Sequence, residues 1–195
     1  MKDIYKPNVF RTLGATNHSD TERELHDFYA TSPSAVEELL KVETFNKEVW
    51  DNCVGKGHIA EVLKKHNYNV KSSDLIDRGY PDTEIKNFFE YNKKVNMDII
   101  INPPYSHAIE FANHSLDIIR RGFKLALFVK LLFLEGQKRR ILFDRQPPKI
   151  VYVFSKRTNC ARDGRFDLHS GSAVAYCWII WEKGYKGITE LKWIN

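Results

Sequence analysis

Short strand-like segments alternate with amphipathic helical segments along most of this chain, and this alternation restricts the fold more than any other feature. Helical spacing predicts helices that begin near residues 32, 59, 108 and 131. A strand–helix–strand order favours parallel strands joined by right-handed crossovers. The expected fold class is therefore α/β, with a doubly wound, mostly parallel sheet. Apolar runs predict its strands at 48–51, 68–74, 97–101, 123–129 and 150–154.

The two ends of the chain depart from this alternation. Residues 173–181 and 190–194 predict two closing strands, with a glycine-containing turn over 183–187. We expect them to form an antiparallel pair at the C-terminal end of the sheet. Residues 1–25 are polar and without period, which predicts an N-terminal arm. Residues 26–195 are then expected to form one domain.

Several classes of protein are disfavoured by composition. The longest nearly apolar run, 125–134, contains Lys130 and is too short to span a bilayer. The first residues lack the apolar core of a secretory signal. The three cysteines and seven histidines show no metal-ligand spacing and no CxxC pair. We therefore expect a cytoplasmic protein with reduced cysteines, no membrane segment and no metal site.

A glycine turn follows the first of these strands. Asp51 ends strand 48–51, and Gly55 and Gly57 then allow a tight turn and close approach of a ligand. A plain strand-to-helix turn would look the same. Asp74, however, ends the next strand 23 residues later, where nucleotide-binding α/β folds place a carboxylate for ribose hydroxyls. Asp51 would repel a pyrophosphate but attract a cation, so the pair favours S-adenosylmethionine over a dinucleotide.

The most specific motif is Asn102-Pro103-Pro104-Tyr105, directly after strand 97–101. Two prolines fix the backbone and remove two amide donors. The Asn102 side-chain oxygen and the Pro103 carbonyl can then accept both hydrogens of a planar amino group. Tyr105 offers a flat ring on which a base can stack. A proline-rich turn with a surface tyrosine is the alternative, and the position after a buried strand disfavours it.

Positive charge is concentrated in one segment. The net charge is +5, and residues 137–165 contain nine basic and two acidic residues. Such a segment is a candidate surface for phosphates, although a solvated helix face with a loop would also explain it. The residues we expect to contact nucleic acid are Lys138, Arg139, Arg140, Lys156, Arg157, Arg162 and Arg165.

Together these motifs resemble the amino-methyltransferase branch of the class I S-adenosylmethionine-dependent methyltransferases. They are most similar to small phage and prophage DNA adenine-N6 methyltransferases. The likeness runs from about residue 28 to 181 and includes the segments 27–33, 50–57, 73–75, 102–105, 133–139 and 151–157. It implies a Rossmann-like sheet of seven strands and S-adenosylmethionine as cofactor.

The resemblance also implies roles for single residues. Asp51, Gly55 and Gly57 would cradle the cofactor, and Asp74 would bind its ribose. Asn87 stands where the family usually has an aspartate, and its oxygen could still accept from the adenine amino group. Residues 52–53, Asn-Cys, also replace the family's usual Pro-Ala pair. The remaining expected cofactor contacts are Tyr29, Thr31 and Pro33 on the methionine side, with Leu75 and Phe88 near adenine.

The expected reaction is methylation of the adenine N6 nitrogen in DNA. Adenine in RNA, or the planar amide of a protein glutamine, would suit the same four-residue motif. A catalytically idle protein that binds nucleic acid is a third possibility, which the intact motif at 102–105 disfavours. The sequence leaves open the target sequence, the oligomeric state and any restriction partner.

Overall fold

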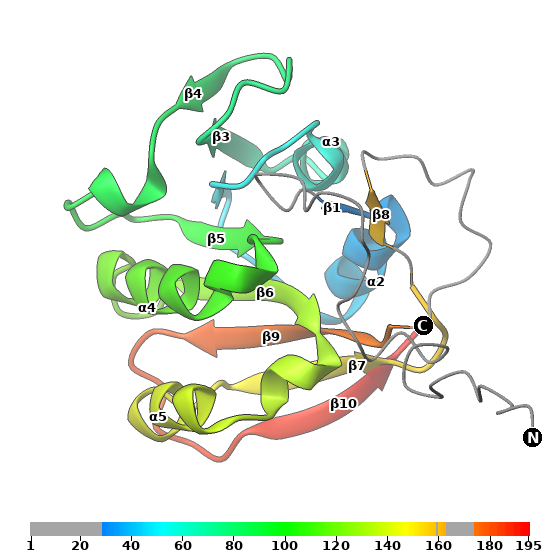
Figure 1. Cartoon of the computed structure of the whole chain (residues 1–195), viewed down its shortest axis with the longest axis vertical. Helices are drawn as coiled ribbons and strands as arrows, with labels where there is room; N and C mark the ends of the chain where they lie inside the picture. Colours follow the sequence, from blue (N-terminus) through cyan, green and yellow to red (C-terminus); the bar gives the residue numbers. More distant parts are fainter. Residues whose placement is uncertain (1–28, 159, 163–173) are drawn as a thin grey trace, which may run out of the picture.

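The computed structural model describes residues 29–158, 160–162 and 174–195, with side chains omitted at 161 and 162. The arm expected at residues 1–25 and the expected contact residue Arg165 lie outside the described residues. The remainder forms a sheet with helices on both faces (Figure 1). The α/β fold class expected from the sequence is confirmed.

The main sheet has eight strands in the order β10-β7-β9-β6-β5-β2-β3-β4. Strand β9 is antiparallel to both of its neighbours, and the other neighbouring pairs are parallel. The β5 and β9 arrows in Figure 1 show the two directions. The strands are β2 (Glu48–Asp51), β3 (Asn69–Asp74), β4 (Thr83–Ile85), β5 (Asp98–Ile101), β6 (Lys124–Lys130), β7 (Ile150–Phe154), β9 (Tyr176–Glu182) and β10 (Glu190–Ile194).

Helices cover the two faces of this sheet. One hydrophobic core contains residues of α4 (Ala108–Ile118) and α5 (Gln137–Arg145), and the other contains residues of α2 (Pro33–Val42) and α3 (His58–Lys65). Short 3-10 turns η1 (Phe88–Glu90), η2 (Tyr105–His107) and η3 (Leu131–Leu134) follow three of the strands. None of the helices in this described part of the chain is long and apolar enough to cross a membrane.

Three sequence expectations need correction here. The helix expected from residue 131 is a 3-10 turn followed by α5, because Gly136 at φ 110° interrupts the helical path. The closing strands β9 and β10 do not pair with each other, because β7 lies between them. Residues 183–189 connect them, and seven extended residues span about 23 Å, enough to pass two strand spacings of about 5 Å each. The sheet also has eight strands rather than seven, because the short strand β4 at the edge was not expected from the sequence.

A second, two-stranded sheet lies beside the main one. Strand β1 (Tyr29–Thr31) pairs antiparallel with β8 (Cys160–Arg162), so that Thr31 lies opposite Cys160. We call this pair the β1–β8 ribbon. In Figure 1 it lies beside α2 and α3. The ribbon brings part of the basic segment next to residues that precede α2.

Candidate active site

Three motifs found in the sequence meet at one edge of the sheet. Strands β3, β2 and β5 are parallel neighbours, with Asp51 opposite Ser72 and Trp50 opposite Ile99. Their carboxyl ends therefore lie together, and each ends in or just before a polar residue: Asp74, Asp51 and Asn102. Ligands of doubly wound sheets bind beyond this edge.

Asp51 is fully buried at the end of β2. Its Oδ1 accepts a hydrogen bond from the Cys53 amide at 3.3 Å, and its Oδ2 is buried with no partner in the described structure. Burial, and to a smaller extent the nearby Asp74 carboxylate, raises the pKa of Asp51 to about 8. A cationic group bound at Oδ2 would offset both causes and favour the charged form.

The glycine turn follows Asp51 in the chain and is hydrogen-bonded to Asp74. Gly55 has φ 57°, and its amide donates to Asp74 Oδ2 at 2.9 Å. The other oxygen, Oδ1, accepts from the Ile76 amide at 3.1 Å. Asp74 is thereby fixed by two backbone bonds. Each carboxylate oxygen can accept more than one hydrogen bond, so both remain able to bind hydroxyl groups.

Gly57 precedes α3 with φ 86°, and a Cβ on it would lie 2.1 Å from the Tyr80 ring. The Tyr80 hydroxyl donates to Glu61 Oε1 at 2.6 Å, which holds the ring in place. Replacement of Gly57 by alanine should therefore lower the free energy of unfolding by about 2 to 4 kcal/mol, through backbone strain and overpacking. Thermal or urea unfolding followed by circular dichroism measures this loss.

Gly79 provides a matched control for this prediction. It has φ 79°, but a Cβ there would meet nothing within 4 Å. Replacement of Gly79 by alanine should then cost only the backbone strain, about 1 kcal/mol. Equal losses in the two variants would show that the Tyr80 contact does not constrain the turn.

Asn102 is held in one orientation by the β1–β8 ribbon. Its side-chain Nδ2 donates to the Tyr29 carbonyl at 2.7 Å. This contact shows which end of the amide is the nitrogen. The other end, Asn102 Oδ1, is buried without a partner in the described residues. Pro103 is buried, and the Pro104 carbonyl accepts from the His107 amide at 2.9 Å. The motif therefore presents a fixed, unpaired acceptor.

Tyr105 is enclosed by Tyr29 and by two residues, Cys160 and Lys130, that the sequence motifs did not reveal. Its hydroxyl donates to Cys160 Sγ at 3.2 Å, and its ring stacks on the Tyr29 ring at 5.6 Å between centroids. Lys130 Nζ lies 4.6 Å from the centre of the Tyr105 ring. Burial is the main reason why the pKa of Tyr105 lies well above its usual value, so its hydroxyl stays protonated. Neither Cys160 nor Lys130 belongs to a recognisable motif.

The other residues expected to contact the cofactor have varied surroundings. Thr31 is buried at the end of β1, and its Oγ1 has no partner in the described structure. Leu75 is 60% exposed just beyond β3. Asn87 accepts from the Phe89 amide at 3.1 Å and so begins η1. Phe88 is only 3% exposed and stacks on Phe111 in the core. Pro33 is exposed as the first residue of α2.

Buried polar atoms without partners gather at this edge of the sheet. Within the described residues they include Thr31 Oγ1, Asp51 Oδ2, Asn52 Nδ2 and Asn102 Oδ1, at the ends of β1, β2 and β5. Each such atom costs about 1 to 3 kcal/mol when it stays unpaired. A polar ligand that pairs with them would recover this cost. The residues present therefore fit a ligand with a cationic group for Asp51 and hydroxyls for Asp74.

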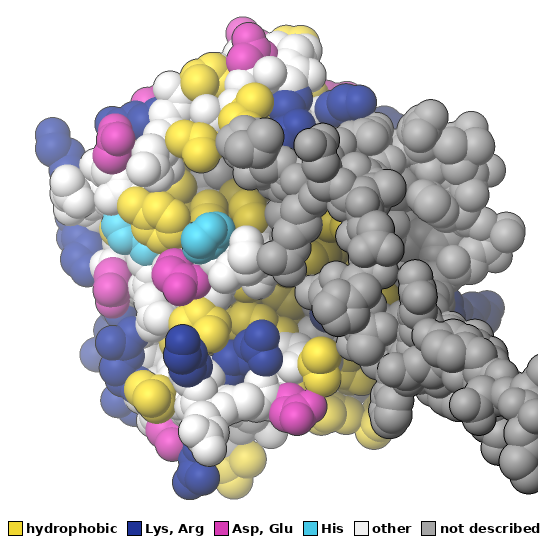
Figure 2. Space-filling view, viewed as in Figure 1, with side chains coloured by type: hydrophobic (Ala, Val, Ile, Leu, Met, Phe, Trp, Pro, Cys, Tyr) yellow, Lys and Arg dark blue, Asp and Glu magenta, His cyan; other side chains and the backbone are white. Residues whose placement is uncertain are grey.

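The basic residues expected to contact nucleic acid lie in α5 and in the segment after β7. Residues 138–140 begin α5, which follows the carboxyl end of β6, and Lys156 and Arg157 follow β7. Figure 2 shows Lys and Arg side chains on the lower part of one face, where Figure 1 places α5. Arg139 donates to the carbonyls of Leu132 and Glu135, so it also secures η3.

The remaining basic residues are less constrained by the structure. Arg140 pairs with Asp144 at 3.4 Å on the solvent side of α5. Lys138, Lys156 and Arg157 are exposed. Arg162 is in β8, but its side chain lies outside the described part of the chain. Within the described residues, no group of three or more His, Cys, Asp or Glu side chains could hold a metal ion.

Known proteins are similar to this chain in structure, whereas the sequence comparisons found no match. No protein-family model and no curated protein sequence matches this chain. A candidate RNA methyltransferase from Pyrococcus horikoshii matches with a TM-score of 0.63 at 14% identity, over 89% of this chain and 95% of that one. This agreement extends over nearly the whole of the archaeal protein.

Two restriction-modification proteins are also similar. The modification subunit of a candidate type I restriction enzyme from Vibrio vulnificus has a TM-score of 0.60 and 13% identity, over 87% of this chain and 47% of that one. The M protein of the type I enzyme EcoKI has a TM-score of 0.55 and 14% identity, over 83% and 45%. The chain thus spans about half the length of these two proteins. It has the Rossmann-like fold of methyltransferases.

Proposed function

We propose that this chain transfers a methyl group from S-adenosylmethionine to the N6 nitrogen of adenine in DNA. The observation that carries the proposal is the Asn102 side chain, whose Oδ1 is a buried acceptor without a partner and whose Nδ2 is bound by the Tyr29 carbonyl. An acceptor held in this way suits an amino group that arrives with the substrate. The methyltransferase fold and the acidic residues beside Asn102 support the same assignment.

The cofactor would lie between the ends of β2 and β3. Asp51 Oδ2 would accept from its ammonium group, and Asp74 would bind the ribose hydroxyls. Thr31 Oγ1, which is buried and unpaired, would provide a further polar contact on the methionine side. Leu75, which is largely exposed, would cover the adenine ring. When bound, the cofactor supplies an electrophilic methyl group on its sulfonium.

Asn102 and Pro103 would activate the amino nitrogen of adenine. The lone pair of this nitrogen is delocalised into the ring, which makes it a poor nucleophile. Asn102 Oδ1 and the Pro103 carbonyl would each accept a hydrogen bond from one N–H of the amino group and favour a tetrahedral nitrogen. Because Asn102 is already oriented by Tyr29, little reorganisation is needed during the reaction. The nitrogen loses one proton after methyl transfer, so the site needs no strong base.

Tyr105 would hold the target base by its ring. In this structure one neighbour of that ring is Tyr29, stacked at 5.6 Å. A base that stacked in the same place would displace the Tyr29 ring, while the Tyr29 backbone carbonyl could keep its bond to Asn102. A base reaches such a site only from a single strand or after extrusion from a duplex.

Charge supports a nucleic acid rather than a protein glutamine as substrate. Lys156 and Arg157 follow β7, which runs in the same direction as β5, so they lie beyond the same strand ends as Asn102. RNA is the second candidate, because the Pyrococcus protein, which is similar over 95% of its own length, is described as a candidate RNA methyltransferase. The two restriction-modification proteins favour DNA.

Nucleoside mass spectrometry tests the proposal. The full chain is incubated with methyl-labelled S-adenosylmethionine and either DNA or RNA, and the Asn102→Ala variant serves as control. We expect labelled N6-methyladenine in DNA with the native chain and almost none with the variant. Label in RNA alone would show that the substrate is adenine in RNA rather than in DNA. No label in either, with the cofactor still bound in calorimetry, would exclude methylation of nucleic acid.

A further inference from the structure

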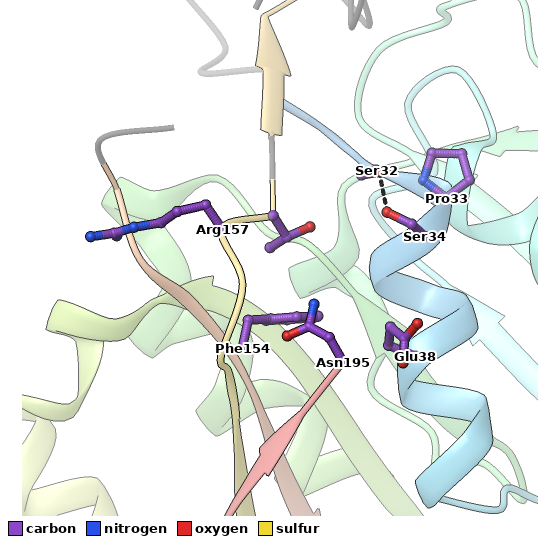
Figure 3. A pocket seen from close by; sticks show the side chains of 8 residues that line it. Ser32, Pro33, Ser34, Glu38, Phe154, Arg157 and Asn195 are labelled. Carbon is purple, nitrogen blue, oxygen red and sulfur yellow. Dashed lines mark hydrogen bonds between the residues drawn. The ribbon is translucent and has the colours of Figure 1, made fainter. Parts of the chain in front are cut away.

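A cavity of about 490 Å³ lies apart from the residues that end β2, β3 and β5. Figure 3 shows it between the first turns of α2 and the ends of β7 and β10. Its polar lining comes from the start of α2, from Arg157 and Thr158 after β7, and from Asn195 after β10. Of these polar side chains only Arg157 was expected to contact the substrate, and Pro33, an expected cofactor contact, also lines the cavity.

Hydroxyl and amide groups supply donors in this cavity, and the Glu38 carboxylate also lines it. Ser32 is the N-cap residue of α2, but its hydroxyl makes no capping bond and lies 2.8 Å from the Ser34 hydroxyl. The first turn of α2 has no acidic residue, so the positive end of the helix stays uncompensated. Glu38, farther along the helix, is paired with Lys41 at 2.7 Å.

Thr158 is an independent sign of a ligand. The residue is only 7% exposed, it lines the cavity, and its Oγ1 is buried with no partner among the described residues. A hydroxyl in this condition destabilises the fold unless something pairs with it. Asn195 Oδ1 already accepts from Ser155 and Lys156, which leaves its amide nitrogen as a further donor. Figure 3 shows Arg157 extended away from α2, so it supplies charge near the cavity rather than a contact.

The β1–β8 ribbon connects this cavity to the candidate active site. Tyr29, the first residue of β1, accepts a hydrogen bond from Asn102 through its carbonyl. Cys160, the first residue of β8, lies opposite Thr31 and accepts from the Tyr105 hydroxyl. Ser32 follows β1 directly, and Thr158 precedes β8 by two residues. A single nucleic acid strand could therefore have one base at the motif and a nearby phosphate in the cavity.

We infer that this cavity binds a phosphodiester of the nucleic acid substrate. Hydroxyls, amide donors and a helix N-terminus together form a site for a phosphoryl oxygen. The inference rests on the proposed function, since the phosphate belongs to the strand that carries the target base. Free phosphate has the same chemistry, and the experiment below separates the two sources.

The test replaces Thr158 by valine, which has nearly the same shape but no hydroxyl. We expect the dissociation constant for a labelled single-stranded DNA, measured by fluorescence anisotropy, to rise about tenfold, as for a lost hydrogen bond to a charged group. The melting temperature should stay the same or rise, because a buried unpaired hydroxyl has been removed. Calorimetric affinity for S-adenosylmethionine should not change.

Thr189→Val is the matched control. Thr189 Oγ1 donates to the Pro148 carbonyl at 2.7 Å, so its loss should lower the melting temperature and leave DNA affinity unchanged. Unchanged DNA affinity in Thr158→Val would overturn the inference, and so would a melting temperature that falls as in the control without weaker binding. The inference would also fail if inorganic phosphate raised the melting temperature of the native chain but not of Thr158→Val, while the two proteins bound DNA with equal affinity. The cavity would then bind free phosphate and not the phosphodiester of DNA.

The methylation assay separates failure of this inference from failure of the proposed function. Weaker DNA binding by Thr158→Val, in a chain that methylates no nucleic acid, would support the phosphate site and reject the activity. Normal methylation and normal DNA binding by Thr158→Val would keep the activity and reject the phosphate site. Absence of any DNA binding by the native chain would also reject it.

Discussion

Replacement of Asn102 by alanine is expected to lower kcat by about 100- to 1,000-fold, the usual effect of removing one preorganised hydrogen-bonding group. The variant loses Oδ1, which is the buried acceptor proposed for the adenine amino group. Cofactor affinity should change less than about twofold, since most of the residues proposed to hold the cofactor end β1, β2 and β3 rather than β5. Single-turnover methylation of DNA measures the first quantity, and calorimetry with S-adenosylmethionine measures the second.

Asn102→Asp is a sharper comparison than alanine. The aspartate keeps an acceptor, but it cannot donate to the Tyr29 carbonyl, which accepts from Asn102 Nδ2 at 2.7 Å. A carboxylate oxygen would instead face that carbonyl, so the acceptor loses its fixed orientation. We expect activity between those of the native chain and the alanine variant. Native activity in the aspartate variant would show that Tyr29 does not orient the group, and native activity in the alanine variant would exclude Asn102 from the chemistry.

The strands that carry the site could be predicted because each contains several consecutive apolar residues and is followed by a helical pattern or a turn motif. Apolar residues in strands 48–51 and 150–154 match the observed strands β2 and β7. The parallel arrangement then follows from the intervening helices. It brings Asp51 and Asn102 to one edge, although 51 residues separate them in the sequence. In this part of the molecule the local pattern and the tertiary arrangement agree.

The contacts around Asn102 and Tyr105 could not be predicted in this way. Strands β1 and β8 have three residues each, too few for a period to be recognised, and more than a hundred residues separate them. Their pairing brings Cys160 to the Tyr105 hydroxyl and the Tyr29 carbonyl to Asn102. The unpaired hydroxyl of Thr158 is likewise a property of packing, because nothing in its sequence neighbourhood distinguishes it from a loop residue.

Replacement of Asp51 by asparagine is expected to raise the dissociation constant for S-adenosylmethionine by about 10- to 100-fold at pH 8, as for a lost hydrogen bond between charged groups. Asparagine can still accept from the Cys53 amide, so the turn after β2 should keep its conformation. What it removes is the negative charge proposed to bind the ammonium group. Calorimetry at constant ionic strength measures the affinity, and thermal unfolding shows whether the variant is folded.

The raised pKa of Asp51 gives this variant a characteristic dependence on pH. In the free protein the pKa of Asp51 is about 8, mainly because the carboxyl is buried, against an ordinary aspartate value of 3.8. Between these values the folded chain holds a proton that the unfolded chain has lost. The contribution of Asp51 to the free energy of unfolding therefore falls as the pH rises from about 4 to about 8, and this fall should be absent in Asp51→Asn.

Cofactor binding should show the opposite trend, because the ammonium group selects the ionised form of Asp51. Below pH 8 the native chain must release a proton to bind, so its affinity should increase by up to about tenfold per pH unit. In Asp51→Asn that increase should disappear, and only the ionisation of the cofactor itself should remain. Titration at pH 6, 7 and 8 in two buffers of different ionisation enthalpy counts the released proton directly. Equal proton release by the native chain and the variant would place the cofactor's ammonium group away from Asp51.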